Sequence, residues 1–185
     1  MRRIFPLLFL ALSMCLGCQS GLSRATVWEK WALREGGLAS QSSQARAQAA
    51  LNALQHHSQS AGVYVLESPK IAAYAWPDGS IFLTSALLEM LEFQEISAVI
   101  AHELGHLSRS RATRDASALL GATQPGDDES RADEFACDLL RHSRLAPQTL
   151  AAALRKVQAA SDLSDEQRQS ILGRANHIVS SVRDK

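Results

Sequence analysis

The strongest constraint on this chain is the run His102-Glu103-Leu104-Gly105-His106, which lies in a stretch whose apolar residues recur every three or four positions. That periodicity predicts a helix. An α-helix turns about 100° per residue, so His102 and His106 project from the same face, one turn apart. Both imidazoles can bind one metal ion, and Glu103 lies close enough to act on a metal-bound water. The run therefore predicts a zinc site on a helix, although two ordinary histidines at a helix edge also fit the motif alone.

The side of this helix that lies opposite its apolar stripe carries the small residues Ala98, Ala101 and Gly105. Glycine in a helix interior costs about 1 kcal/mol relative to alanine, so its presence here needs a reason. Close packing of a second element against this side supplies that reason. We therefore expect the helix to lie at the centre of the fold.

A catalytic zinc ion needs a third protein ligand, and two histidines with one glutamate form a known set. Glu129 and Asp133 lie four residues apart in a segment expected to be helical, so they share one face. We expect Glu129 to complete the zinc shell and Asp133 to accept a hydrogen bond from the second ring N–H of a ligand histidine. The alternative for Glu129 is a favourable interaction between an acid in a first helical turn and the helix dipole. Asp133 lies too deep in the helix for that role.

Three segments of the chain resemble one known family. The H-E-x-x-H run, the pattern Glu129-x-x-Ala132-Asp133 and the stretch 73–88 are together similar to the membrane-associated gluzincin metallopeptidases, the family of HtpX, BepA and the CAAX prenyl endopeptidase. The resemblance implies a zincin-like α+β fold, mostly helical, with a small three-stranded sheet beside the active-site helix. It also implies one Zn²⁺ per chain and a metalloendopeptidase in which Glu103 activates a zinc-bound water.

The same resemblance points to a strand that binds the substrate, formed by Ala73, Tyr74, Ala75 and Trp76. An extended peptide can add to the edge of a sheet through main-chain hydrogen bonds. This mode of binding reads the backbone more than the side chains. The expected partner is therefore a polypeptide substrate that is unfolded or misassembled.

The family often carries a His–Arg pair after the second motif helix, and His177 and Arg183 have its spacing. The resemblance implies that these residues stabilise the oxyanion or cap the zinc ion in a closed state. The alternative is an ordinary polar helix terminus.

The remaining segments are expected to complete one domain, since 185 residues with 46% hydrophobic content suffice for a single core. An N-terminal helical segment, 18–59, is expected to pack on a catalytic core, 60–185. Its helix or helix pair should break near Gly36-Gly37. Its expected core contacts are Trp28, Trp31 and Leu33.

Three short strands and five helices are expected within the core. The strands are predicted at 63–66, 72–76 and 80–83, with a turn at Pro77-Asp78-Gly79 between the last two. The helices are predicted at about 85–91, 94–110, 128–143, 147–160 and 164–175. A long loop between Ser110 and Asp128 is expected near the cleft.

The N-terminus reads as an export signal. Two arginines precede an apolar run over 4–16, which is too short for a transmembrane helix of about 20 residues. The glycine before Cys18 resembles a bacterial lipoprotein processing site, so 1–17 is expected to be removed and Cys18 lipidated. The alternative is an ordinary secretory signal with a passive cysteine. By resemblance to Gram-negative lipoproteins, Gln19 favours the outer membrane as the destination. We therefore expect a lipid-anchored protein on the periplasmic face of the cell envelope, and we expect it to act on envelope proteins.

Charge and cysteine content narrow the possible partners. The chain has 19 basic and 19 acidic residues and no basic stripe, so no nucleic-acid partner is expected. After processing at Cys18, Cys137 has no partner for an intrachain disulfide and is expected to be a small buried residue rather than a zinc ligand. Two further functions remain open. The chain could be a lipoprotein assembly factor or holdase with little turnover, or a zinc hydrolase with a non-peptide substrate.

Overall fold

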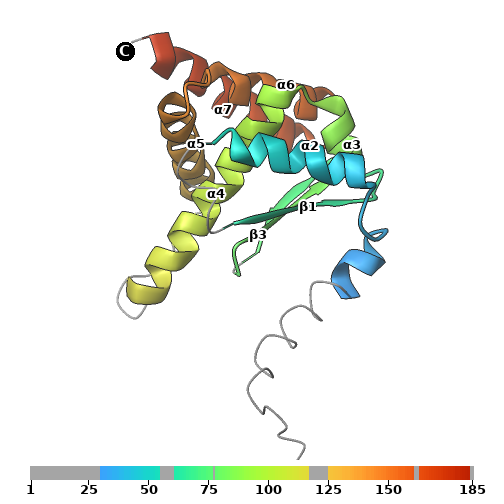
Figure 1. Cartoon of the computed structure of the whole chain (residues 1–185). Helices are drawn as coiled ribbons and strands as arrows, with labels where there is room; N and C mark the ends of the chain where they lie inside the picture. The colour runs from blue at the N-terminus through green and yellow to red at the C-terminus, as the bar shows by residue number, and fades with distance from the viewer. Residues whose placement is uncertain (1–29, 55–60, 77, 117–124, 161–162, 184–185) are drawn as a thin grey trace, which may run out of the picture.

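The computed structural model describes residues 30–54, 61–76, 78–116, 125–160 and 163–183 (Figure 1). These residues are mostly helical and form one three-stranded sheet, so the α+β prediction is confirmed. In chain order the named elements are α2 (Gln41–Asn52), β1 (Gly62–Leu66), β2 (Ala73–Ala75), β3 (Ser80–Thr84), α3 (Ser85–Met90), α4 (Phe93–Ala116), α5 (Pro125–His142), α6 (Gln148–Ala160) and α7 (Asp165–Arg183). No helix among the described residues is long and apolar enough to cross a membrane.

The sheet has the strand order β1-β3-β2, with β1 parallel and β2 antiparallel to β3. A tight turn joins β2 to β3, in which the N–H of Gly79 donates to the carbonyl of Trp76 at 2.9 Å. Gly79 has a φ of 100°, a conformation that glycine adopts without steric cost. Within the described residues no strand pairs with the outer side of β2, so β2 is an edge strand.

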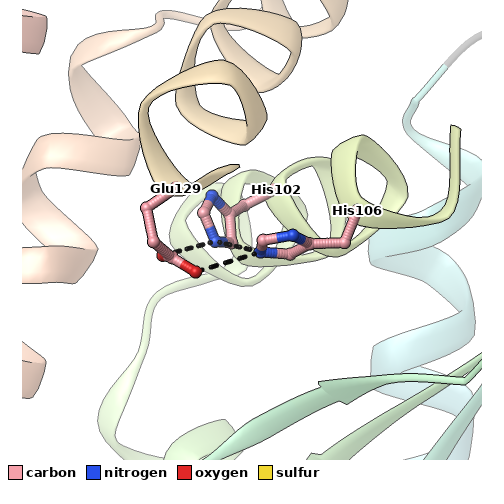
Figure 2. A group of neighbouring side chains, drawn as sticks. All are labelled: His102, His106 and Glu129. Carbon is pink, nitrogen blue, oxygen red and sulfur yellow. Dashed lines mark hydrogen bonds and ion pairs between the residues drawn. The ribbon is translucent and has the colours of Figure 1, made fainter. Parts of the chain in front are cut away.

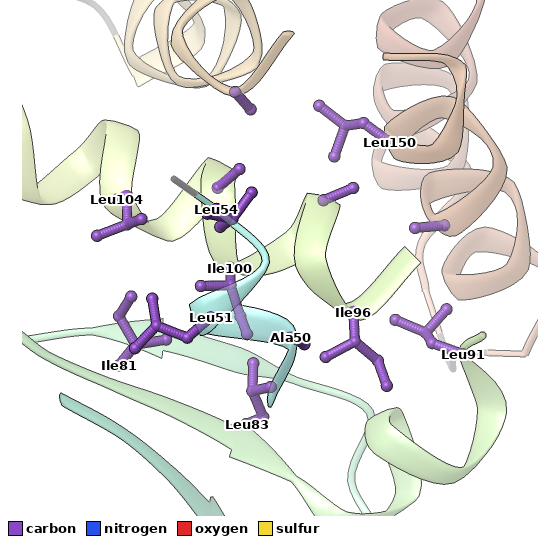
Figure 3. Packing of buried hydrophobic residues seen from close by; sticks show 14 of the residues in the cluster. Ala50, Leu51, Leu54, Ile81, Leu83, Leu91, Ile96, Ile100, Leu104 and Leu150 are labelled. Atoms are coloured by element: carbon purple, nitrogen blue, oxygen red, sulfur yellow. The ribbon is translucent and has the colours of Figure 1, made fainter. Parts of the chain in front are cut away.

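The main core lies between one face of the sheet and helices α2 and α4. Side chains alternate across a strand, so Ile81 and Leu83 of β3 point toward these helices. They meet Leu51 of α2 and Ile96 and Ile100 of α4, all nearly inaccessible to solvent (Figure 3). The apolar stripe of α4 is therefore buried as the sequence predicted.

The other face of the sheet carries an aromatic cluster. Tyr74 and Phe82 lie with their ring centroids 5.4 and 5.1 Å from that of Trp31, which comes from a short helix over 30–34. The prediction that Trp31 contacts the core is confirmed, but that for Leu33 is wrong because its side chain is 74% exposed. Two residues along a helix is about 200° around its axis, so the two side chains face opposite ways. Trp28 lies outside the described residues.

Helix α5 packs closely against α4 at the predicted small residue. A methyl group at Gly105 would lie 2.9 Å from the Cα of Ala132, so the two backbones touch there. The predicted element against the back of α4 is thus α5.

Three helix ends differ from the prediction. Helix α4 continues to Ala116 and α5 already begins at Pro125, so the predicted loop between them was too long. Proline is favoured at the first helical position, and Pro125 occupies it in α5. Helix α7 continues to Arg183 rather than ending near residue 175.

Candidate metal centre

Two helices bring three potential metal ligands together. His102 and His106 project from α4, and Glu129 projects toward them from α5 (Figure 2). The Nε2 atoms of the two histidines are 3.1 Å apart. One carboxylate oxygen of Glu129 lies 3.4 Å from Nε2 of His102, and the other lies 3.4 Å from Nε2 of His106.

These distances fit a tetrahedral zinc ion. Zinc binds histidine nitrogen and carboxylate oxygen at about 2.0–2.2 Å, so two ligand atoms on one tetrahedral ion lie about 3.3–3.5 Å apart. The separations of 3.1 and 3.4 Å match that spacing closely. The donor set of two imidazoles and one carboxylate is also one that catalytic zinc uses, with a fourth position left for water. The predicted ligands are therefore arranged as a zinc site requires.

The group opens into a cavity of about 590 Å³, which we call the site cavity. Its walls are His102, Glu103, His106 and Glu129 on one side and the strand segment from Ala73 to Trp76 on the other. His102 and Glu103 are buried, whereas the Glu129 side chain is 41% exposed. The metal ligands and the predicted substrate strand thus face one shared space.

Asp133, one turn beyond Glu129, lies behind His102. Its Oδ1 is 2.9 Å from Nδ1 of His102. The ring N–H does not point at that oxygen well enough for a hydrogen bond, so the contact is a short electrostatic one. The two residues therefore lie in contact, without the hydrogen bond that the sequence predicted.

Arg174 of α7 donates hydrogen bonds to the carboxylates of both Asp133 and Glu129. Its Nε donates to Oδ2 of Asp133 and its Nη2 to Oδ1, each at 2.7 Å. Its Nη1 donates to Oε2 of Glu129 at 2.5 Å. Sequence reasoning missed this residue. One signal was present, since Arg174 lies on the same stripe of α7 as Ile171 and Ile178, and a charged residue there needs a buried partner.

The structure does not bring His177 to the metal ligands. It is exposed on α7 and lines another cavity between α5 and α7, which also borders Asp133 and Arg174 but none of the three metal ligands. Arg174 lies three residues before His177 on the same helix, and it is Arg174 that reaches the carboxylates of Asp133 and Glu129. Arg183 is the last residue of α7, and its side chain lies outside the described part, as does Cys18.

Burial and neighbouring charges shift the pKa values of three residues in the site. Burial lowers the pKa of His102, but its contacts with Asp133 and Glu129 outweigh this and raise the pKa to about 9. The contacts with His102 and His106 hold the pKa of Glu129 well below its usual range. Burial raises the pKa of Glu103, against the opposing effect of the two histidines. Glu103 is therefore a carboxylate whose environment favours accepting a proton.

Comparisons with known proteins agree with part of this site. The model of Peptidase family M48 matches residues 38–126, which include α2, the sheet and the H-E-x-x-H run but end before Glu129. A protein named Protease HtpX homolog from Helicobacter pylori (strain Shi470) is 45% identical over 49 residues. That alignment covers 24% of this chain and 16% of the relative. The homolog of the same name from strain J99 aligns with the same figures. The chain thus spans only a small part of the length of these relatives.

Proposed function

We propose that this chain, which belongs to the M48 peptidase family through residues 38–126, is a zinc-dependent metalloendopeptidase. The observation that carries the proposal is the convergence of His102, His106 and Glu129 at the spacing of a tetrahedral ion. Glu129 lies outside the matched range, so the geometry adds the third ligand independently of the family match. One zinc ion per chain follows from one such group among the described residues.

Glu103 is the proposed general base. A bound zinc ion supplies Lewis-acid chemistry, because it polarises the scissile carbonyl and lowers the pKa of water. Glu103 takes the proton of the attacking water and delivers it to the leaving amine. Its burial favours this role, because a buried carboxylate binds a proton more readily than one in water.

The substrate in this proposal is an extended polypeptide lying along β2. The strand pairs with β3 on one side only, and its residues form a wall of the site cavity. An added strand needs a free peptide backbone, which unfolded and misassembled chains offer. Because the N-terminus resembles a lipoprotein signal, we place these substrates among envelope proteins. The proposed location is the periplasmic face of the outer membrane, through a lipid on Cys18. Such a peptidase would serve protein quality control.

The experiment that tests this function measures zinc content and cleavage of unfolded casein by the purified protein. The control is Glu103→Gln, which keeps the metal ligands and removes the base. The expected result is one zinc ion per chain in both proteins and cleavage by the parent alone. Zinc binding without cleavage in the parent would favour the alternative of an assembly factor or holdase. Absence of zinc would contradict the proposed site itself.

A further inference from the structure

A second cavity adjoins the site cavity. It has a volume of about 190 Å³ and shares Ala73, His102 and Glu103 with the site cavity. We call it the apolar pocket, because most of its remaining wall is aliphatic. Its main side chains come from α4, α6 and α7 and are Val99, Leu150, Leu154, Val157 and Ile171.

We infer that the apolar pocket binds one side chain of the substrate, that of the residue whose nitrogen leaves when the peptide bond is cut. This inference rests on the proposed peptidase function and names its specificity. It selects large aliphatic side chains and phenylalanine at that position. The newly formed N-terminus of the product should therefore be such a residue.

The position follows from which site residues the pocket touches. It borders His102 and Glu103 but neither His106 nor Glu129. Glu103 delivers a proton to the leaving nitrogen, so that nitrogen must lie beside its carboxylate in the reaction. The side chain on the same residue is then the one nearest to the mouth of the pocket.

The size and polarity of the pocket define the side chain. An apolar cavity of about 150 Å³ can hold benzene, so a pocket of this volume has room for an isobutyl group or a phenyl ring. Its polar lining residues are His102, Glu103 and Arg174, and Arg174 is already bound to Asp133 and Glu129. A charged substrate side chain would lose its water against a mainly aliphatic wall.

The family match covers only part of the wall of this pocket. Leu150, Leu154, Val157 and Ile171 all follow residue 126, where the matched range ends. Helices α6 and α7, which follow the matched range, therefore complete the pocket.

The first test is cleavage of a diverse peptide library by the purified zinc-loaded protein, with the cut positions identified by mass spectrometry. The expected result is enrichment of leucine, isoleucine, methionine and phenylalanine directly after the cut. One methylene in an apolar pocket changes kcat/KM by about 10–200-fold, so leucine should exceed alanine there by at least about tenfold. Cuts with no preference at this position, or with a preference for charged residues, would overturn the inference but not the peptidase. No cuts at all would instead contradict the proposed function.

The second test changes the pocket. Val157→Phe fills it and should lower kcat/KM for a leucine substrate at least about tenfold relative to an alanine substrate. Val157→Ala enlarges it and should favour phenylalanine over leucine. The matched control is Val179→Phe, since Val179 is also half-buried against the core but does not line the pocket. The control should keep the parental preference, with equal zinc content in all variants. An unchanged preference in both Val157 variants would refute the role of the pocket.

Discussion

Replacement of Arg174 by methionine should destabilise the metal-free protein by about 3 kcal/mol. The Asp133 side chain is 6% exposed and receives two hydrogen bonds from Arg174, which is itself 17% exposed. Removing one partner of a buried pair costs about 3–5 kcal/mol, because the other charge stays buried. The lower end of this range applies because Nδ1 of His102 lies 2.9 Å from the same carboxylate and still offsets part of its charge. The contact with Glu129 adds little, since that side chain is 41% exposed and its pairing is screened by water.

The assay is urea unfolding at pH 7 in the presence of a chelator, followed by circular dichroism. Arg141→Met is the matched control, because Arg141 pairs with Asp138 at 2.6 Å but the Asp138 side chain is 66% exposed. That variant should lose less than about 1 kcal/mol. Arg174→Lys keeps the charge without the paired hydrogen bonds and should fall between the two.

The loss should also depend on pH. Burial raises the pKa of Asp133, but the contacts with Arg174 and His102 outweigh this and lower the pKa below its usual range. Stability from a depressed carboxyl pKa is present above the unfolded value of about 3.9 and disappears as the pH falls through the folded value. The difference between parent and Arg174→Met should therefore be complete at pH 7 and shrink below about pH 4. A loss at pH 7 no larger than that of Arg141→Met would refute the reasoning.

Further outcomes are expected for the metal centre and for Cys18. Glu103→Gln should keep its zinc but lose at least about 10²–10⁴-fold in peptidase rate, and a parental rate would exclude it as the base. Glu129→Ala should lose zinc on dialysis while Asp128→Ala keeps it, as measured by metal analysis; equal retention would reject Glu129 as a ligand. Because the pKa of His102 is raised to about 9, zinc binding at pH 7 should release a proton, detectable by calorimetry in two buffers. In urea unfolding with a chelator, the stability that this protonated His102 gives should be complete below about pH 6.5 and be lost as the pH rises through about 9. Cys18→Ala should abolish fatty-acid labelling, and an unlabelled parent would favour a plain secretory signal.

The parts of the site that the sequence predicted depend on local geometry. His102 and His106 share a helix face at any position in a fold, because four residues make about one turn. Glu129 and Asp133 repeat that spacing on α5, and both now lie beside His102. The strands followed in the same way from local apolar patterns and from the turn at Gly79.

The parts that the sequence did not predict depend on how distant elements pack. Arg174 and His177 are neighbours in the chain, and only the orientation of α7 against α5 decides which of them reaches the carboxylates. The apolar pocket likewise needs α4, α6 and α7 together, so no single segment contains its signal. The end of α4 was missed because its last turns lack an apolar stripe to read.

The contact between Gly105 and Ala132 requires glycine at the second variable position of the H-E-x-x-H motif in this chain. Gly105 precedes His106 directly, and Ala132 lies within one turn of Glu129, so the two helices touch at the level of the metal ligands. The reach of a glutamate side chain is short, and its carboxylate arrives at the histidines only because a hydrogen atom separates the two backbones there. Gly105, which is not itself a metal ligand, thus sets the distance that the side chain of Glu129 has to span to reach the histidines.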